Sequence, residues 1–279
     1  MGSILKTFML LGVLSVLVIT LGGLFGGRDG MTMAFVFSLL MNGGMYFFSD
    51  KLALKMSRAK PLNLNTYKDL YKMVEELAKK INIPMPDLYI TPETQANAFA
   101  TGRGPGHASV AVTQGILDTL PKEELRAVLA HELAHVKNRD ILVATVAAVM
   151  ASTISFISNM AMFGGFGGND DDDNRGAGAF GIVIAILVPI AAAVIQMAIS
   201  RQREFGADET SARTIGDGKP LAKALLAIHD STRRFPMRTN PAMSSLYIGN
   251  PLGGFGGTMM KLFSTHPPVE ERVKRLEKF

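Results

Sequence analysis

The sequence contains no cysteine and no tryptophan in its 279 residues. Without cysteine, the chain can form no disulfide, no thiolate metal site and no cysteine nucleophile. Any metal ion bound by side chains must therefore be held by histidine, aspartate or glutamate. The missing cysteine leaves the redox compartment of the protein undetermined.

Charged residues are also few beside the apolar ones, at 19% against 48%, and the mean hydropathy is +0.22. Four apolar stretches lie at about residues 4–26, 31–48, 141–163 and 179–200. Each is long enough, or nearly so, for a transmembrane helix of roughly 17 to 25 residues. The first stretch is long for the apolar part of a signal peptide and the second follows it at once, so we expect an uncleaved hairpin.

The basic residues fall on one side of the membrane if the chain crosses it four times. They precede the first and third apolar stretches and follow the second and fourth: Lys6, Lys51, Lys55, Arg58, Lys60, Lys137, Arg139, Arg201 and Arg203. The positive-inside rule then predicts that both termini and residues 49–140 are cytoplasmic. The net charge of +5 fits an anionic lipid bilayer better than nucleic acid, because the basic residues are mixed with acidic ones and lie near apolar spans.

The composition between the second and third apolar stretches is that of a soluble domain. The spacing of apolar residues predicts an amphipathic helix at 64–81, and alternation predicts a strand at 87–91 and a β-hairpin of 96–101 with 108–113. A further helix is expected to begin at Pro121, since two glutamates follow it in the first turn.

That last helix carries the motif His131-Glu-Leu-Ala-His135. Residues four apart share one face of a helix, so His131 and His135 can present two imidazoles to one metal ion, with Glu132 beside them as a general base. The alternative is a surface helix with two solvated histidines. The small residues Ala130 and Ala134 favour the metal site, because they allow a close approach.

Two histidines leave a catalytic zinc site without its third protein ligand. His135 and Glu204 lie about equally far, roughly 9 Å along a helix, from the membrane ends of the third and fourth apolar stretches. If those stretches run antiparallel, Glu204 meets the two histidines just above the membrane, and Asp208, four residues later, can accept a hydrogen bond from a ligand imidazole. The alternative for Glu204 is a surface carboxylate paired with Arg201 or Arg203.

Other polar residues are weaker candidates. Asp140 is too near His135 in sequence to be an obvious ligand, and we expect His107 and His229 to be solvated. Residues Asn97, Ala98 and Phe99 could form an exposed edge strand that pairs with the backbone of a substrate. A buried strand of the predicted hairpin is the alternative for these three.

Taken together, the motifs resemble the HtpX-type membrane zinc endopeptidases, which are distant relatives of the CAAX prenyl endopeptidases. The likeness covers nearly the whole chain: the four apolar stretches, NAFATG at 97–102, HELAH at 131–135, REFGAD at 203–208 and THPPVEER at 265–272. The resemblance implies one Zn²⁺ per chain on His131, His135 and Glu204, with Glu132 as catalytic base. It also implies a role in quality control of misfolded membrane proteins at the bacterial inner membrane.

The resemblance further places the segment that holds His266 and Arg272 near the cleft, where either could stabilise an oxyanion. From the residues alone, an ordinary helix start is equally expected there.

We therefore predict a mainly α integral membrane protein with four transmembrane helices and a cytoplasmic α+β zincin-like metalloprotease domain. Its parts are a transmembrane hairpin at 1–50, a first protease part at 51–140, a second hairpin at 141–200 and a second protease part at 201–279. The predicted reaction is hydrolysis of peptide bonds at the cytoplasmic face. A zinc-dependent scaffold or chaperone is the alternative, and it would not need Glu132.

Two other classes fit less well. An intramembrane protease would bury its motif in an apolar span, whereas charged residues flank this one on both sides: Lys122, Glu123, Glu124, Arg126, Lys137 and Arg139. A transporter would carry paired charges within its spans, and these spans hold almost none.

Overall fold

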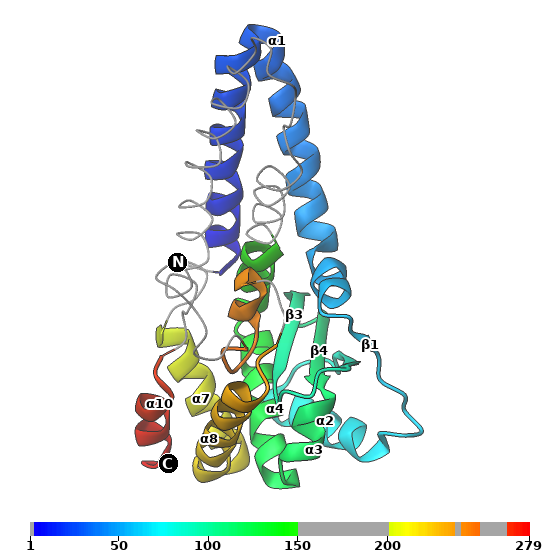
Figure 1. Cartoon of the computed structure of the whole chain (residues 1–279), viewed down its shortest axis with the longest axis vertical. Helices are drawn as coiled ribbons and strands as arrows, with labels where there is room; N and C mark the ends of the chain where they lie inside the picture. The colour runs from blue at the N-terminus through cyan, green and yellow to red at the C-terminus, as the bar shows by residue number, and fades with distance from the viewer. Residues whose placement is uncertain (1–2, 150–200, 238–240, 252–266) are drawn as a thin grey trace, which may run out of the picture.

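A computed structural model of the chain describes residues 3–149, 201–237, 241–251 and 267–279. The N-terminal part is one long helical hairpin, α1 (Ser3–Met56), which reverses at Gly27, where φ is 57° and ψ is −141°. Glycine alone adopts such angles without steric penalty. The two legs rise together above the rest of the protein (Figure 1).

The legs of α1 meet closely near the bend. A Cβ added at Gly22 would lie 2.5 Å from the carbonyl oxygen of Gly30, so only glycine permits this approach. Further down, the Asn42 side chain donates a hydrogen bond of 2.8 Å to Ser15 Oγ in the opposite leg. The predicted pair of apolar stretches at 4–26 and 31–48 therefore forms a hairpin.

Within the described residues, one helical stretch, Gly27–Met56, is both long enough and apolar enough to cross a membrane. Its large apolar side chains are exposed, as expected of a surface that faces lipid, and include Met33, Phe35, Leu39, Leu40 and Phe47. The predicted third stretch begins as the apolar helix Asp140–Val149. The remainder of it, and the whole fourth stretch, lie outside the described residues, so the four crossings stay a prediction.

Below the hairpin lies a four-stranded sheet in the order β1-β2-β4-β3. Strands β2 (Asp87–Thr91) and β4 (His107–Thr113) are parallel, whereas β3 (Ala98–Gly104) runs antiparallel to β4. The predicted strand and hairpin are thereby confirmed. The two-residue β1 (Lys60–Pro61), which pairs antiparallel with β2, was not predicted.

Helices surround the sheet. They are α2 (Lys68–Ile81), α3 (Gln114–Thr119), α4 (Lys122–Lys137), α7 (Arg201–Ile215), α8 (Lys219–Arg234), the 3₁₀ helix η1 (Pro241–Leu246) and α10 (Val269–Leu276). The helix predicted at 64–81 begins later, at Lys68, because the Asn63 side chain accepts from the backbone amides of Asn65 and Thr66 in a turn. The helix expected at Pro121 is α4.

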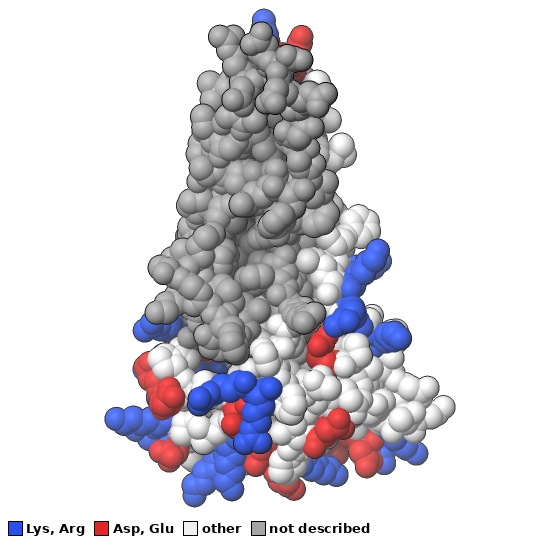
Figure 2. Space-filling view, viewed as in Figure 1, with Lys and Arg blue, Asp and Glu red and all other residues white. Residues whose placement is uncertain are grey.

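Two buried clusters hold the fold together. The larger joins α2, α4 and α8 to the sheet through residues such as Leu77, Leu129, Leu133, Val110 and Leu225. The smaller joins α1 to the domain below it through Leu54, Phe99, Leu142, Val146 and Tyr247. Charged side chains gather over this lower domain on the face shown in Figure 2.

Candidate metal centre

Helix α4 buries the predicted motif beneath the sheet. The exposed fractions of His131 and Glu132 are 1% and 2%, and the neighbouring Ala130, Leu133 and Ala134 are fully buried. One helical turn brings the two imidazoles together, with 3.2 Å between His131 Nε2 and His135 Nε2. Because His131 is buried and the His135 side chain is only 16% exposed, a surface helix with two solvated histidines is ruled out.

Helix α7 delivers Glu204 to the same point. Glu204 Oε1 lies 3.5 Å from His135 Nε2, and Oε2 lies 3.8 Å from His131 Nε2. The three candidate ligand atoms all lie within 4.8 Å of one another, so a single metal ion can contact all three. This set of two nitrogens and one oxygen on buried side chains fits the donor set of a catalytic zinc site.

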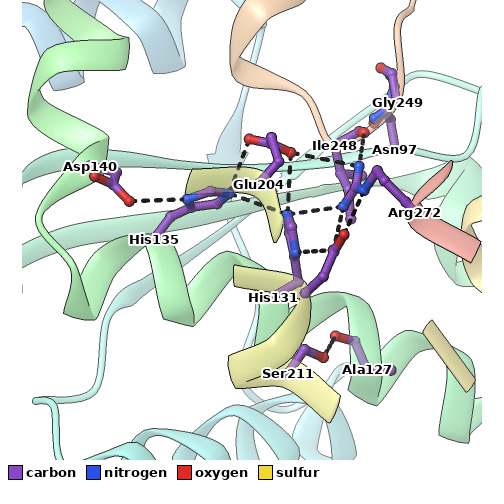
Figure 3. Close-up of polar contacts among 11 residues, drawn as sticks. Asn97, Ala127, His131, His135, Asp140, Glu204, Ser211, Ile248, Gly249 and Arg272 are labelled. Carbon is purple, nitrogen blue, oxygen red and sulfur yellow. Dashed lines mark hydrogen bonds and ion pairs between the residues drawn. The ribbon is translucent and has the colours of Figure 1, made fainter. Parts of the chain in front are cut away.

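A side-chain hydrogen bond sets the register of α7 against α4. Ser211 Oγ donates 2.7 Å to the carbonyl oxygen of Ala127, and both groups are buried (Figure 3). With this register, the face of α7 that carries Glu204 and Asp208 points at the two histidines, as the spacing of four predicted.

Asp208 contacts the far side of the first imidazole. Its Oδ1 lies 2.9 Å from His131 Nδ1, as expected of a carboxylate that orients a ligand histidine. The Arg272 side chain, 1% exposed, donates two hydrogen bonds to this carboxylate, at 2.9 Å from Nε and 2.7 Å from Nη2. Arg272 Nη1 also lies 3.6 Å from Glu204 Oε2.

The sequence predicts Arg272 as an oxyanion donor, but the Nε and Nη2 groups of its guanidinium already donate to the Asp208 carboxylate. The geometry therefore favours a supporting role, in which Arg272 fixes Asp208 and, through it, His131. The second oxyanion candidate, His266, lies outside the described residues.

The second imidazole has a carboxylate that the sequence did not single out. Asp140 Oδ2 lies 3.6 Å from His135 Nδ1, and Arg203 Nη1 lies 3.6 Å from Asp140 Oδ1. Asp140 is the first residue of the apolar helix that follows α4. Its nearness to His135 in sequence argued against a ligand, yet that nearness is what brings the carboxylate to the other ring nitrogen.

Burial and charge shift the pKa values of these groups. Burial raises the pKa of Glu132 to about 7, although the backbone amide of Ala100 donates a hydrogen bond to its carboxylate. Burial would also raise the pKa of Asp208, but the adjacent Arg272 charge lowers it to about 2. Glu132 is thus poised near neutral pH to exchange a proton, whereas Asp208 stays ionised.

The two histidines shift in opposite directions. Burial lowers the pKa of His131 to about 4. Burial would lower the pKa of His135 too, but the nearby carboxylates of Asp140, Glu204 and Glu132 raise it to about 9. In the metal-free protein, His131 is therefore neutral and His135 carries the proton.

A cleft opens at this cluster. Ala100 of β3, Ala144 and the segment Ser245–Ile248 line it together with the histidines and Glu204. The predicted substrate strand Asn97, Ala98 and Phe99 is buried. The Ile248 amide donates 3.0 Å to the Ala98 carbonyl, and the Asn97 side chain bonds both the amide and the carbonyl of Gly249.

The start of β3 is therefore covered by the chain itself, and its next outward residue, Ala100, reaches the cleft. The remaining histidines, His107 and His229, are exposed as expected and lie away from the cluster.

An HExxH helix whose two histidines meet a carboxylate from a later helix defines the metallopeptidase class that uses a glutamate base. Comparison with known proteins agrees: residues 65–279 match the family model "Peptidase family M48". The chain belongs to this family and is a membrane-associated metalloendopeptidase.

Similar proteins extend over the whole chain. A "Protease HtpX homolog" of Pelotomaculum thermopropionicum is 49% identical over 98% of this chain and 97% of its own length. Another "Protease HtpX homolog", from Ralstonia pickettii, is 49% identical over 98% of this chain and 95% of its own length. The crystal structure of S. mikatae Ste24p shares the fold with a TM-score of 0.53 at 19% identity, and the match covers 98% of this chain and 65% of that one.

Proposed function

We propose that this protein is a zinc-dependent endopeptidase that cleaves misfolded membrane proteins at the cytoplasmic face of the bacterial inner membrane. The observation that carries the proposal is the cluster of His131, His135 and Glu204, whose ligand atoms all lie within 4.8 Å of one another, with Glu132 in the same cleft. The HtpX homologues among its relatives support the same activity.

His131, His135 and Glu204 would hold the zinc ion, which supplies a polarised, readily deprotonated water and a Lewis acid for the scissile carbonyl. The Glu132 carboxylate accepts a proton from the attacking water and delivers it to the leaving amine. Glu132 is buried beside the proposed ligands, so its carboxylate can reach a water held at the same place. Asp208 keeps the Nδ1 proton on His131, which leaves Nε2 free to bind.

The edge of β3 supports a way to hold the substrate backbone. Ile248 and Gly249 already bond to Ala98 and Asn97. The Ala100 amide donates to Glu132, so the carbonyl of Ala100, which lines the cleft, is the group that would contact the substrate backbone. Backbone pairing at this edge would align an extended peptide over the metal and would select little by sequence.

The chemistry is tested with Glu132→Gln, which keeps the shape of the side chain but cannot take up a proton. We expect a fall in casein cleavage of roughly 10²- to 10⁴-fold with bound zinc unchanged, since general base catalysis contributes about this much. A variant that cleaves casein as fast as the parent would support the zinc-dependent scaffold or chaperone instead.

The absence of cysteine gives a direct test of topology. Single cysteines placed at Asp29, at the hairpin tip, and at Phe279, at the C-terminus, can be labelled in intact cells by a maleimide that does not cross membranes. We expect labelling at position 29 only. Labelling of position 279 in intact cells would contradict a cytoplasmic C-terminus.

The substrate class is tested in reconstituted vesicles with one membrane protein in a native and a destabilised form. We expect the destabilised form to be cleaved faster, because a substrate must offer an extended segment to the edge of β3. Equal rates for the two forms would argue against quality control.

A further inference from the structure

A carboxylate faces the Nδ1 atom of each proposed ligand imidazole, and an arginine lies beside each carboxylate. At His131, Asp208 contacts Nδ1 at 2.9 Å and is itself held by Arg272 at 2.7 Å. At His135, Asp140 lies 3.6 Å from Nδ1 and Arg203 lies 3.6 Å from Asp140. Each ring thus has its Nε2 toward the other ligands and its Nδ1 toward a carboxylate paired with an arginine.

The two supports come from different parts of the molecule. Asp208 and Arg272 belong to α7 and α10 of the lower domain. Asp140 begins the apolar helix Asp140–Val149, and Arg203 lies in the first turn of α7. The pair of Asp140 and Arg203 therefore joins the two ends of the 141–200 stretch, which the sequence predicts to enter and leave the membrane.

The local backbone brings Asp140 back to the site. Helix α4 ends at Lys137, and Arg139 then adopts a left-handed φ of 59°, which is uncommon for a residue with a side chain. This turn starts a new helix at Asp140 while the chain is still beside His135. The Asp140 and Arg203 side chains are 10% and 16% exposed, so their charges are largely shielded from water.

We propose that Asp140 and Arg203 are positioning residues for the metal centre, which tie the His135 ligand to both ends of the second membrane segment. The Asp140 carboxylate, 3.6 Å from Nδ1, favours the imidazole that carries its proton on that nitrogen and turns Nε2 toward the metal. Arg203, 3.6 Å from the other oxygen of Asp140, holds that carboxylate in place by its charge. The inference rests on the proposed zinc site. The proposed zinc site would then be held by Asp140 and Arg203 next to the predicted membrane segment, and by Asp208 and Arg272 within the lower domain.

The test measures zinc affinity rather than proteolysis. Full-length protein in detergent, carrying Glu132→Gln so that it cannot digest itself, competes with a chelator of known affinity for Zn²⁺. We expect Asp140→Asn to weaken zinc binding about 10- to 100-fold, the usual effect of losing a carboxylate behind a ligand histidine. Arg203→Gln should weaken it less, and Arg203→Lys should restore part of that loss, because a positive charge returns.

Arg201→Gln is the matched control, since Arg201 is an exposed arginine in the same helical turn that lies outside the pair. It should leave zinc affinity unchanged. In addition, Asp140→Asn combined with Arg203→Gln should bind zinc no more weakly than Asp140→Asn alone, because the two residues act as one unit. Cobalt in place of zinc should show an altered visible absorption spectrum in Asp140→Asn, which a purely structural loss would not produce.

Three results separate the possibilities. Unchanged zinc affinity in Asp140→Asn, with the parent binding zinc, would overturn the positioning role and leave the proposed function intact. Losses that add in the double variant would overturn the link between Asp140 and Arg203. A parent that binds no zinc, with Glu204→Ala indistinguishable from it, would overturn the proposed metal site itself.

Discussion

At the scale of single residues, the centre is a buried network of ions. Three acidic side chains, Glu132, Glu204 and Asp208, share the interior with Arg272 and the two histidines. A buried ion pair adds little net stability, because desolvation opposes the attraction, but removing one partner leaves the other charge uncompensated. Arg272 is the residue on which this balance depends, because it contacts both Asp208 and Glu204.

We therefore expect Arg272→Met to destabilise the metal-free protein by about 3 to 5 kcal/mol, as measured by denaturant unfolding in detergent. The cause is the Asp208 carboxylate, which loses its charge partner in a site that water does not reach. Arg213→Ala serves as control, since its ion pair with Glu209 is exposed and is worth under about 1 kcal/mol. Equal effects of the two substitutions would show that Arg272 is not structurally coupled to Asp208.

The raised pKa of His135 predicts a pH dependence of metal binding. Zinc needs a neutral imidazole, and His135 is protonated below a pKa of about 9 in the metal-free protein. Zinc affinity should thus rise with pH up to about 9, and binding at pH 7.5 should release a proton. Calorimetry in two buffers of different ionisation enthalpy measures this release. Glu132→Gln protein should release fewer protons, because it lacks the Glu132 carboxyl and a charge that raises the pKa of His135.

The same shift has the opposite effect on the metal-free fold. A pKa raised from 6.5 to about 9 stabilises the folded state fully below pH 6.5 and loses that contribution as pH rises through 9. Unfolding of metal-free protein should therefore become easier between these values. A stability that rises across this range would contradict the assignment of the proton to His135.

At the scale of elements, the site depends on where α10 sits, because Arg272 lies on that helix. Gly218, at the start of α8, packs against the end of α10: a Cβ there would lie 2.1 Å from the carbonyl oxygen of Leu276. Because the contact involves the backbone of both helices, a larger residue at position 218 could be accommodated only by a shift of a whole helix. The close approach of α8 to α10 therefore requires glycine at position 218.

Gly218→Ala should push α10 away and destabilise the protein by about 1 to 3 kcal/mol, the usual effect of overpacking. Zinc affinity should fall with it, because Arg272 retreats from Asp208. The matched control is Gly206→Ala in α7, where an added Cβ meets nothing within 4 Å and alanine favours the helix by about 0.5 to 1 kcal/mol. Thermal unfolding and chelator competition check both variants, and equal results for them would argue against the packing account.

The sequence predicted the elements with a clear periodicity and the groups that share a helix face. These include α4 with His131 and His135, the β-hairpin, and the meeting of Glu204 with both histidines. It did not predict β1, whose two residues are too few to show a period.

Contacts between distant segments were also missed. The Gly249 amide bonds to the Asn97 side chain, 152 residues away in sequence. No local sequence pattern predicts such a contact. The spacing of Asp140 and His135 argues against a shared metal ion and gives no signal for a contact with the other nitrogen of His135.

At the scale of the whole molecule, the hairpin and the lower domain share one hydrophobic cluster. Leu54 of α1 packs in the same buried group as Phe99, Leu142 and Tyr247, and the Arg103 guanidinium lies 5.4 Å from the ring centre of Phe47. The lower domain is therefore packed against α1 and is not simply tethered to it. Helix α1 shields apolar side chains of this domain from solvent.

Deletion of residues 1–56 should accordingly expose Phe99, Leu142 and Tyr247 and make the remaining chain aggregate. Size-exclusion chromatography in detergent checks this, with the full chain under the same conditions as control. We expect the shortened chain in the void volume. A shortened chain that runs as a monodisperse species and still binds zinc would show that the domain is independent of α1.

The chain order of the metal centre has one more consequence. His131, Glu132 and His135 precede residues 150–200, whereas Glu204, Asp208 and Arg272 follow them. A ribosome that has reached residue 200 has therefore made the proposed base and two of the proposed ligands, but neither Glu204 nor Arg272. A nascent chain that ends before Glu204 should therefore lack the proposed metal site, so we expect it to cleave neither itself nor its neighbours.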